Sequence, residues 1–163
     1  MNRIAIVFLF VPLMAGLMFA AAAQNEHARI KELARGADVI ATGRVTQKKS
    51  AWNKDKTRIY THTTVRVDEY IKGGGSAASL EITSPGGEVD GVGEIYSHMP
   101  KFEEHEEVLV FLKQDKTRNA FRVVEGEAGK ITLVKDPKTS EKMAGPGVRI
   151  RELKSQIRKS LED

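Results

Sequence analysis

Val-Ile-Ala-Thr-Gly-Arg-Val, residues 39–45, places small or apolar side chains at every second position, between more variable neighbours. Residues 59–67 repeat this period through Thr61 and Thr63, and residues 51–56 between the two stretches have the composition of a turn. A period of two is typical of β-strands, which also favour β-branched side chains. The sequence therefore predicts two long strands joined as a hairpin.

Further strands are expected after this hairpin. Residues 80–82 begin a third strand, and the run Val-Leu-Val-Phe-Leu at residues 108–112 is apolar on both faces, which is typical of a deeply buried strand. Two more strands follow at residues 121–124 and 131–134, with a turn at residues 126–129 between them. Short strands separated by turns favour a mainly β fold, a closed or partly open OB-like barrel of five to seven strands, over a parallel α/β sheet.

The barrel domain is expected to cover residues 37–134, preceded by a short helix within residues 24–36. Ile30 and Leu33 lie at helical spacing, and Gly36 follows at the position of a left-handed C-cap. Helical periodicity is otherwise confined to the other end of the chain.

The C-terminal segment, residues 148–163, is predicted to be a helix with one narrow apolar stripe. The stripe consists of Ile150, Leu153, Ile157 and Leu161, and basic residues cover much of the remaining surface. Such a helix docks against the barrel or lies on anionic lipid, and the narrow stripe favours docking. Residues 135–147, with two prolines and two glycines, are expected to be a linker or mobile loop.

The first 23 residues have the layout of a secretory signal peptide. Arg3 gives a positive start, residues 4–23 carry no charge, and three alanines precede the expected cut after Ala23. An uncleaved anchor is the alternative, because an apolar stretch of about 20 residues can span a bilayer. We expect cleavage and a periplasmic or secreted protein, with membrane contact only through an uncleaved signal segment or a lipid-bound C-terminal helix.

The composition excludes several classes of protein. Cleavage leaves about 140 residues, the size of one domain, and the chain has no cysteine, so disulfides, thiolate zinc sites and thiol catalysis are excluded. Without Arg3, 25 of the 26 Lys and Arg remain, against 22 Asp and Glu. This small positive excess is spread through mixed-sign segments, and nucleic-acid binding needs a concentrated basic face. We expect no nucleic-acid partner.

Three blocks of the sequence recur together in a known family. They are residues 37–45, beginning Ala-Asp-Val-Ile, residues 60–73, ending Glu-Tyr-Ile-Lys-Gly, and residues 107–112, Glu-Val-Leu-Val-Phe-Leu. In this order they resemble the netrin-like module, the OB-type barrel of tissue inhibitors of metalloproteinases. Together with the residues between them they are also similar to a family of bacterial exported domains, some of which occur beside matrixin-type metalloproteases. The residues of this second resemblance are Pro85, Gly86, Gly87, Glu88, Gly91, Pro100 and Phe102.

The resemblance implies an OB-like barrel and a protein partner, with an extracytoplasmic metalloprotease as one candidate. In those inhibitors an N-terminal cysteine chelates the zinc of the protease. This sequence has no cysteine, so the resemblance implies no inhibitory mechanism for any of its residues.

The turn Ser-Pro-Gly-Gly-Glu at residues 84–88 has the most unusual local sequence. Its glycines allow positive φ angles or close approach of a ligand, and Asp90 and Glu94 add carboxylates nearby. A calcium or partner contact and a wide barrel turn both remain open, and the turn is favoured. Trp52, in the polar hairpin tip, is either an exposed contact residue or folds over the barrel end.

The loops of residues 50–57 and 84–104 are expected to form a recognition surface, and Ile95 with Tyr96 is predicted to be a short strand inside the second loop. The expected binding residues are Trp52, Pro85, Gly86, Gly87, Glu88, Tyr96 and Phe102. Barrel folds place contacts on loops and keep the packed strands rigid.

His98 and His105, beside three glutamates, form a weak candidate metal site, because their spacing of seven is not typical of paired ligands. No Gly-x-Ser-x-Gly elbow is present, so we expect no catalytic residues and no cofactor. The sequence predicts an exported, non-enzymatic module that binds a protein partner through its loops. An envelope structural or assembly factor acting through the basic C-terminal helix is the alternative, and a metal-assisted hydrolase is a weaker one.

Overall fold

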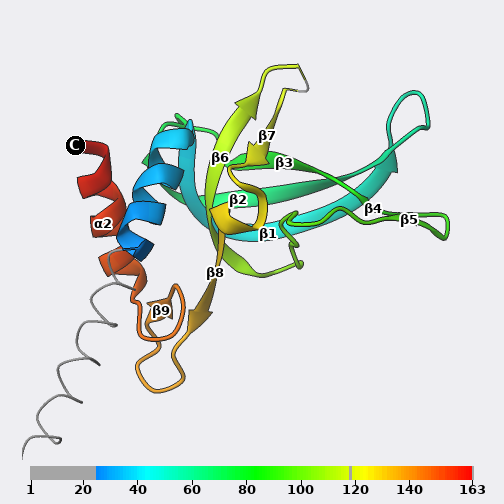
Figure 1. Cartoon of the computed structure of the whole chain (residues 1–163). Helices are drawn as coiled ribbons and strands as arrows, with labels where there is room; N and C mark the ends of the chain where they lie inside the picture. The colour runs from blue at the N-terminus through cyan, green and yellow to red at the C-terminus, as the bar shows by residue number, and fades with distance from the viewer. Residues whose placement is uncertain (1–24, 118, 163) are drawn as a thin grey trace, which may run out of the picture.

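The computed structural model describes residues 25–117 and 119–162. This part of the chain is mainly β, with one helix at each end (Figure 1). The predicted signal peptide and its cut after Ala23 lie outside the described residues. Within the described part, no helix has the length and apolar character needed to cross a membrane.

The elements follow one another in the order helix, strands, helix. After a helix over residues 25–36 come β1 (Val39–Trp52), β2 (Ile59–Lys72), β3 (Ser79–Pro85), β4 (Gly87–Val89), β5 (Val92–Glu94), β6 (Glu107–Asp115), β7 (Ala120–Val123), the 3-10 helix η2 (Gly126–Gly129), β8 (Lys130–Lys135), β9 (Lys142–Met143) and α2 (Ile150–Glu162).

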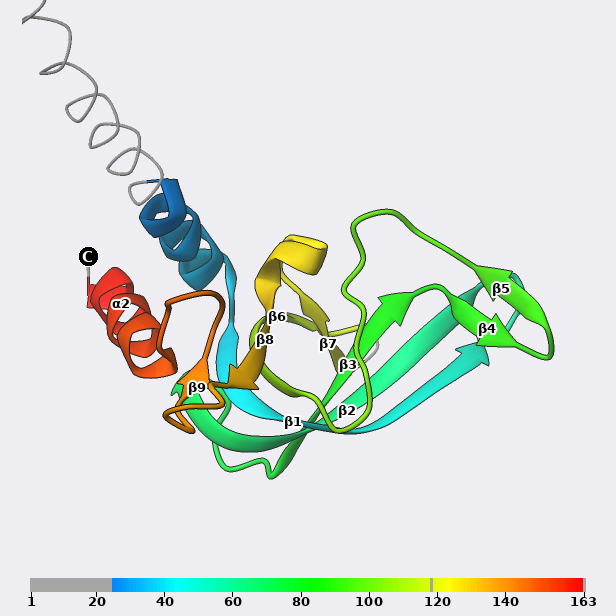
Figure 2. The same cartoon turned by 90° about the horizontal axis from the view of Figure 1, so that it is seen from below.

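Five strands close into a ring in the order β1-β2-β3-β7-β6, because β6 also pairs with β1. Four of the five junctions are antiparallel, and β3 meets β7 in parallel through the single pair Ile82 and Phe121. The ring is therefore the expected OB-like barrel, partly open at the β3–β7 junction, and β8 and β9 extend the sheet from β6. Figure 2 shows both helices at one end of the barrel and the β4–β5 hairpin at the other.

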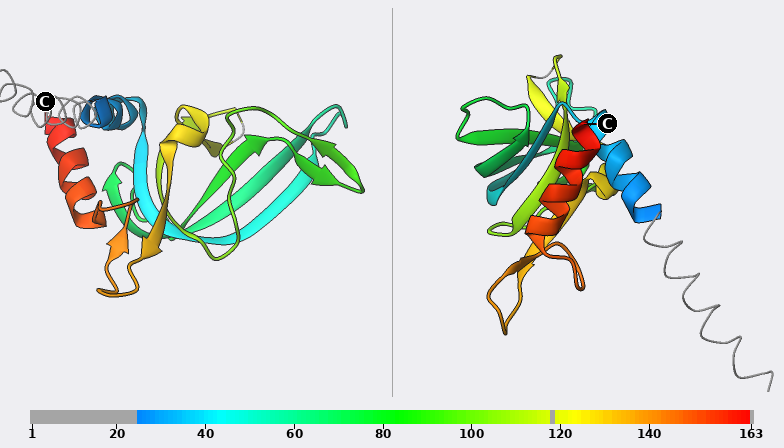
Figure 3. Two further views of the ribbon diagram at one scale, coloured as in Figure 1. Left: turned by 60° about the horizontal axis from the view of Figure 1, so that its bottom comes forward. Right: turned by 90° about the vertical axis from the view of Figure 1, so that its left-hand side faces the viewer.

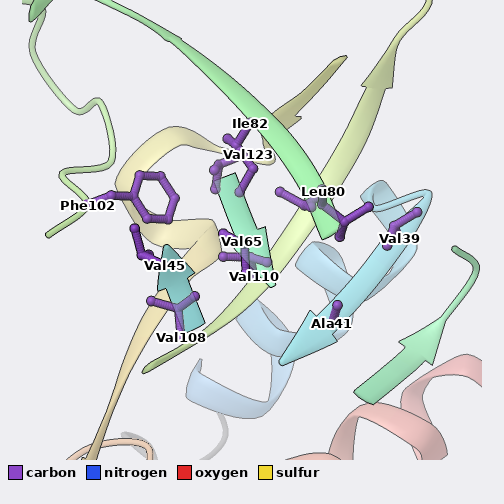
Figure 4. Close-up of a cluster of buried hydrophobic side chains, with 11 residues drawn as sticks. Val39, Ala41, Val45, Val65, Leu80, Ile82, Phe102, Val108, Val110 and Val123 are labelled. Carbon is purple, nitrogen blue, oxygen red and sulfur yellow. The ribbon is translucent and has the colours of Figure 1, made fainter. Parts of the chain in front are cut away.

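Strand β6 is buried on both faces, as its sequence predicts. Val108 and Val110 point into the barrel, where they pack with side chains of β1, β2, β3 and β7 (Figure 4). Leu109 and Phe111 point the other way and pack against the two helices. The helices are therefore part of the hydrophobic core.

The apolar stripe of α2 docks against the barrel. Leu153 and Ile157 are buried in the same cluster as Phe111, and Ile150 and Leu161 are partly buried against it. The stripe is covered by the protein itself, as the docking interpretation predicts.

Gly36 does not form the predicted left-handed C-cap. It is the last residue of the N-terminal helix and does not have a positive φ angle. The ammonium group of Lys72 donates instead to the carbonyl oxygens of Ala34 and Ala37, at 2.8 and 2.6 Å. A side chain of β2 thus satisfies backbone acceptors at the end of this helix.

Residues 135–147, predicted to be a linker or mobile loop, contain one short strand. Lys142 and Met143 form β9, which pairs with β8, and Met143 also bridges to Arg149. The Lys142 ammonium group lies 2.7 Å from a carboxylate oxygen of Glu107 in β6. Backbone pairing with β8 and this ion pair with β6 hold the segment to the barrel. Its prolines and glycines had indicated only turns.

Two ion pairs connect α2 to the barrel. The Glu69 carboxylate of β2 accepts hydrogen bonds from Lys154 at 2.5 Å and from Arg158 at 2.8 Å. The hydrogen bond from Lys154 is the main reason why the pKa of Glu69 lies below its usual range. The carboxylate therefore stabilises the fold above the ordinary pKa of glutamate, and this contribution is lost as the pH falls through the lowered value.

The substitution Glu69→Gln is expected to lower the free energy of unfolding at neutral pH by about 0.5–1 kcal/mol, because the pairs are partly exposed. At about pH 3 the difference from the unsubstituted protein should be smaller, because the carboxyl group of the unfolded chain is protonated there, and it disappears only below the lowered pKa of Glu69 in the folded protein. Urea unfolding at both pH values measures this effect, with Glu162→Gln on the same helix as the control. Equal losses for the two variants at neutral pH would contradict the assigned role of Glu69.

Candidate functional site

A cleft of about 470 Å³ lies beside the β4–β5 hairpin. One wall comes from β1 and β2, a second from the turn between β3 and β4, and a third from the loop that follows β5. The paired strands β1 and β2 supply the first wall, and loops supply the others. Figure 3 shows the loop after β5 crossing from the hairpin back to the barrel.

Six of the seven predicted binding residues line this cleft. They are Pro85, Gly86, Gly87, Glu88, Tyr96 and Phe102. Trp52 is not among the lining residues. It ends β1, pairs with Ile59 and is half-buried, so the structure places it in the sheet and not at a free loop tip.

Phe102 both lines the cleft and belongs to the core of the barrel. Its side chain is only 3% exposed and packs with the barrel interior, beside Val45 (Figure 4). The Lys130 ammonium group lies 5.1 Å from the centre of its ring, within cation–π range. Phe102 is therefore primarily a core residue, and the prediction of a loop contact did not anticipate this burial.

The turn at residues 84–88 lies directly on the β1–β2 ribbon. The Thr61 hydroxyl donates to the Gly86 carbonyl oxygen at 2.7 Å, so the Ser50 hydroxyl, 3.0 Å away, donates to Thr61. A Cβ atom on Gly87 would lie 2.3 Å from the Ser50 oxygen and 2.5 Å from the Thr61 oxygen. Gly87 is needed for this close approach, which supports the interpretation of the glycines as a packed turn.

The Glu94 carboxylate fixes the end of the hairpin. It accepts hydrogen bonds from the backbone N–H of Ile59 at 3.1 Å and from the Tyr96 hydroxyl at 3.2 Å. Glu94 thus holds β5 to the start of β2 and orients Tyr96 at the cleft.

The loop over the cleft is held to β1 by Lys48. Its ammonium group donates to the Phe102 carbonyl oxygen at 2.9 Å and to the Glu103 carboxylate at 3.1 Å. Farther along the loop, the backbone N–H of His105 donates to the Val45 carbonyl oxygen at 2.9 Å. These contacts shape the third wall of the cleft in the free protein.

Exposed apolar side chains gather at the rim. Four large apolar side chains are exposed in the described part of the chain: Ile95 and Tyr96 line the cleft, Val92 lies on β5 and Val134 lies on β8. Ile95 is 95% exposed and contributes nothing to the core. A cluster of exposed apolar side chains beside a concave surface is typical of an interaction site.

The weak metal candidates are not assembled. No group of three or more His, Asp or Glu side chains that could hold a metal ion occurs within residues 25–117 and 119–162. The His98 carbonyl oxygen accepts the N–H of Glu127 in η2, whereas the backbone of His105 pairs with β1. The two histidines are thus held by different elements, and the calcium interpretation of the 84–88 turn has no support either.

Sequence reasoning missed the part of the cleft that the strands contribute. Lys48 and Ser50 from β1 and Thr61 and Thr63 from β2 line it, as does the rim residue Ile95. The alternation of side chains in each strand places Lys48 with Ser50 and Thr61 with Thr63 on a common face, so this pattern was the available signal.

Comparison of the chain with known protein families and with curated proteins gives no match. The functional argument therefore depends on the geometry of the cleft.

Proposed function

We propose that this chain is an exported, non-enzymatic binding module that recognises a protein partner through the cleft and its apolar rim. The observation that carries the proposal is the gathering of Tyr96, the 84–88 turn and the exposed Ile95 around one cleft. An extracytoplasmic protease is the partner class that the sequence resemblance implies.

The preformed shape of the cleft supports binding. Hydrogen bonds from Lys48, Thr61 and Ile59 fix all its walls, so little conformational entropy would be lost on association. Its volume lies within the range of known binding sites, about 300–1,000 Å³.

The arrangement of hydroxyl and imidazole groups favours binding over nucleophilic catalysis. His62 is near a hydroxyl group, that of Thr83, but Thr83 and Glu81 both approach its Nδ1 atom, at 3.4 and 2.9 Å. A catalytic triad needs the nucleophile and the carboxylate on opposite ring nitrogens. His62 is also outside the cleft lining.

Site-specific photo-crosslinking in the native cell tests the proposal. A photoreactive residue replaces Ile95 at the rim, and the same residue replaces Val134, an exposed apolar position on β8, as the control. We expect a protein to be crosslinked at position 95 and the same product to be missing at position 134. Identical products at both positions would overturn the proposal.

The substitution Ile95→Ala is expected to leave the free energy of unfolding within about 0.5 kcal/mol, because the side chain is almost fully exposed. Binding of the crosslinked partner should weaken about tenfold, since an apolar contact at the rim is lost. Calorimetric titration of the purified pair measures the affinity, with Val134→Ala as the matched control. Unchanged affinity for Ile95→Ala would argue against rim recognition.

A further inference from the structure

Strand β1 has an open edge along its outer half. Strand β6 covers this edge only from Val39 to Arg44, and the backbone of Val45 then bonds to residues 105 and 106. From Thr46 to Trp52 no strand of the described part pairs with β1 on that side. Figure 3 shows the outer half of β1 with β2 along one edge alone.

The alternation of hydrogen bonds in the β1–β2 ladder identifies which backbone groups of β1 face the open edge. The N–H of Asn53 donates to the carbonyl oxygen of Arg58, so residue 53 faces the β2 side. In an antiparallel pair every second residue faces the same side, so Lys48, Ser50 and Trp52 face the open edge. The N–H of Lys48 points that way and is 3.3 Å from the Glu104 carboxylate.

The open edge borders the cleft. Lys48 and Ser50 line the cleft, so their side chains lie on its face of β1, whereas Lys49 lies on the opposite face. In a strand added at Ser50 and Trp52, successive side chains would alternate between the same two faces as those of β1. Its side chains would lie by turns beside the cleft and beside Lys49.

The arm formed by the outer β1–β2 hairpin is basic. Lys49, Lys54, Lys56 and Arg58 are exposed, and none of them has an ion-pair partner among the residues that the structure describes. Asp55 is the one acidic residue within residues 48–58. Two copies of β1 paired with each other would bring like charges together, which disfavours a second copy as the occupant.

We propose that the partner supplies an extended acidic segment, which pairs antiparallel with the β1 edge at Ser50 and Trp52 and places alternate apolar side chains in the cleft. This inference depends on the proposed function and specifies the chemistry of its partner. Backbone hydrogen bonds supply affinity in this mode, and the pockets beside the edge supply specificity. Lysines on an open edge can instead serve to prevent strand pairing. The peptide experiment below separates recognition of an acidic strand from this protective role.

The probe is a fluorescein-labelled peptide of about eight residues that alternates glutamate and valine, the length of an ordinary strand. Fluorescence anisotropy with the purified secreted protein is expected to show saturable binding. The same peptide with lysine in place of glutamate should bind about tenfold more weakly, because it meets the basic arm with like charge. Equal binding of the two peptides would overturn the acidic preference.

Backbone methylation tests the strand pairing. In an antiparallel pair, the peptide residues that bond to Ser50 and Trp52 have their side chains on the cleft side, and these are the valines. N-methylation of the valines should weaken binding about tenfold through the lost hydrogen bonds, and N-methylation of the glutamates should leave it nearly unchanged. Equal binding of both methylated peptides and the parent would overturn the proposal.

Charge variants of the protein provide a second test. The double substitution Lys49→Glu and Lys56→Glu should weaken binding of the acidic peptide about fivefold and strengthen binding of the lysine peptide. Lys138→Glu, on the exposed turn between β8 and β9, is the control for charge reversal at a distance. Equal effects of the arm and control substitutions would contradict recognition by the arm.

The outcomes separate this inference from the proposed function. A partner crosslinked at position 95, together with failure of all the peptides to bind, would overturn strand pairing and leave the binding module in place. Absence of a crosslinked partner at position 95 would overturn the proposed function itself. Slower amide exchange at Ser50 and Trp52 in the presence of the acidic peptide would support pairing at this edge.

Discussion

Replacement of Phe111 by alanine is expected to lower the free energy of unfolding by about 3–5 kcal/mol. Phe111 is the largest fully buried side chain in the described part of the chain. It projects from β6 into the cluster that contains Leu33 of the N-terminal helix and Ile157 of α2. Because three separate elements meet at this side chain, movement of one of them cannot fill the cavity.

This loss is large compared with the stability of a typical domain, about 5–15 kcal/mol. Urea unfolding followed by circular dichroism measures it, and Val134→Ala on the neighbouring β8 is the control, because Val134 is 55% exposed. The control is expected to stay within about 0.5 kcal/mol of the unsubstituted protein. A loss for Phe111→Ala as small as that of the control would show that the helices do not pack on β6.

The elements that the sequence predicted share strong periodicity or complete burial. The long hairpin of β1 and β2 followed from a period of two, and β6 from a run that is apolar on both faces. The stripe of α2 followed from helical spacing. In each case the side chains of one continuous segment determine the pattern, so no knowledge of tertiary structure was needed.

The β4–β5 hairpin was missed, and the strand predicted at Ile95 and Tyr96 was wrong. Val89 pairs with Val92, and the two residues between them, Asp90 and Gly91, have φ angles of 52° and 79°. Asp-Gly with both φ angles positive is the signature of a type I′ hairpin turn. Strands of three residues are too short to show a period, so this dipeptide was the usable signal.

The cleft was predictable only in part. The 84–88 turn and Tyr96 belong to one segment, so local sequence brought them together. Lys48 and Ser50 join them through the register of β1 with β2, which shifts between Val45 and Gln47. Such a bulge changes which side chains share a face, and no local pattern in the sequence marked it.

The substitution Gly87→Ala is expected to lower the free energy of unfolding by about 2–4 kcal/mol, through overpacking combined with backbone strain. The φ angle of Gly87 is 133°, in a region that residues with a side chain rarely adopt. The new methyl group would also collide with the hydroxyl oxygens of Ser50 and Thr61. Relief of that collision requires the turn to leave the β1–β2 ribbon, which breaks the hydrogen bond from Thr61 to Gly86.

Gly91→Ala isolates the contribution of the collision. Gly91 also has a positive φ angle, but a Cβ atom there has no neighbour within 4 Å, so only strain of about 1–2 kcal/mol is expected. Urea unfolding compares the two variants, and crosslinking at position 95 should be lost in Gly87→Ala and retained in Gly91→Ala. If the two variants lose the same stability and the same crosslinked product, Gly87 serves only as a flexible turn residue. A larger loss at Gly87 would mean that contact between the turn and the hydroxyl groups of β1 and β2 gives the cleft its shape.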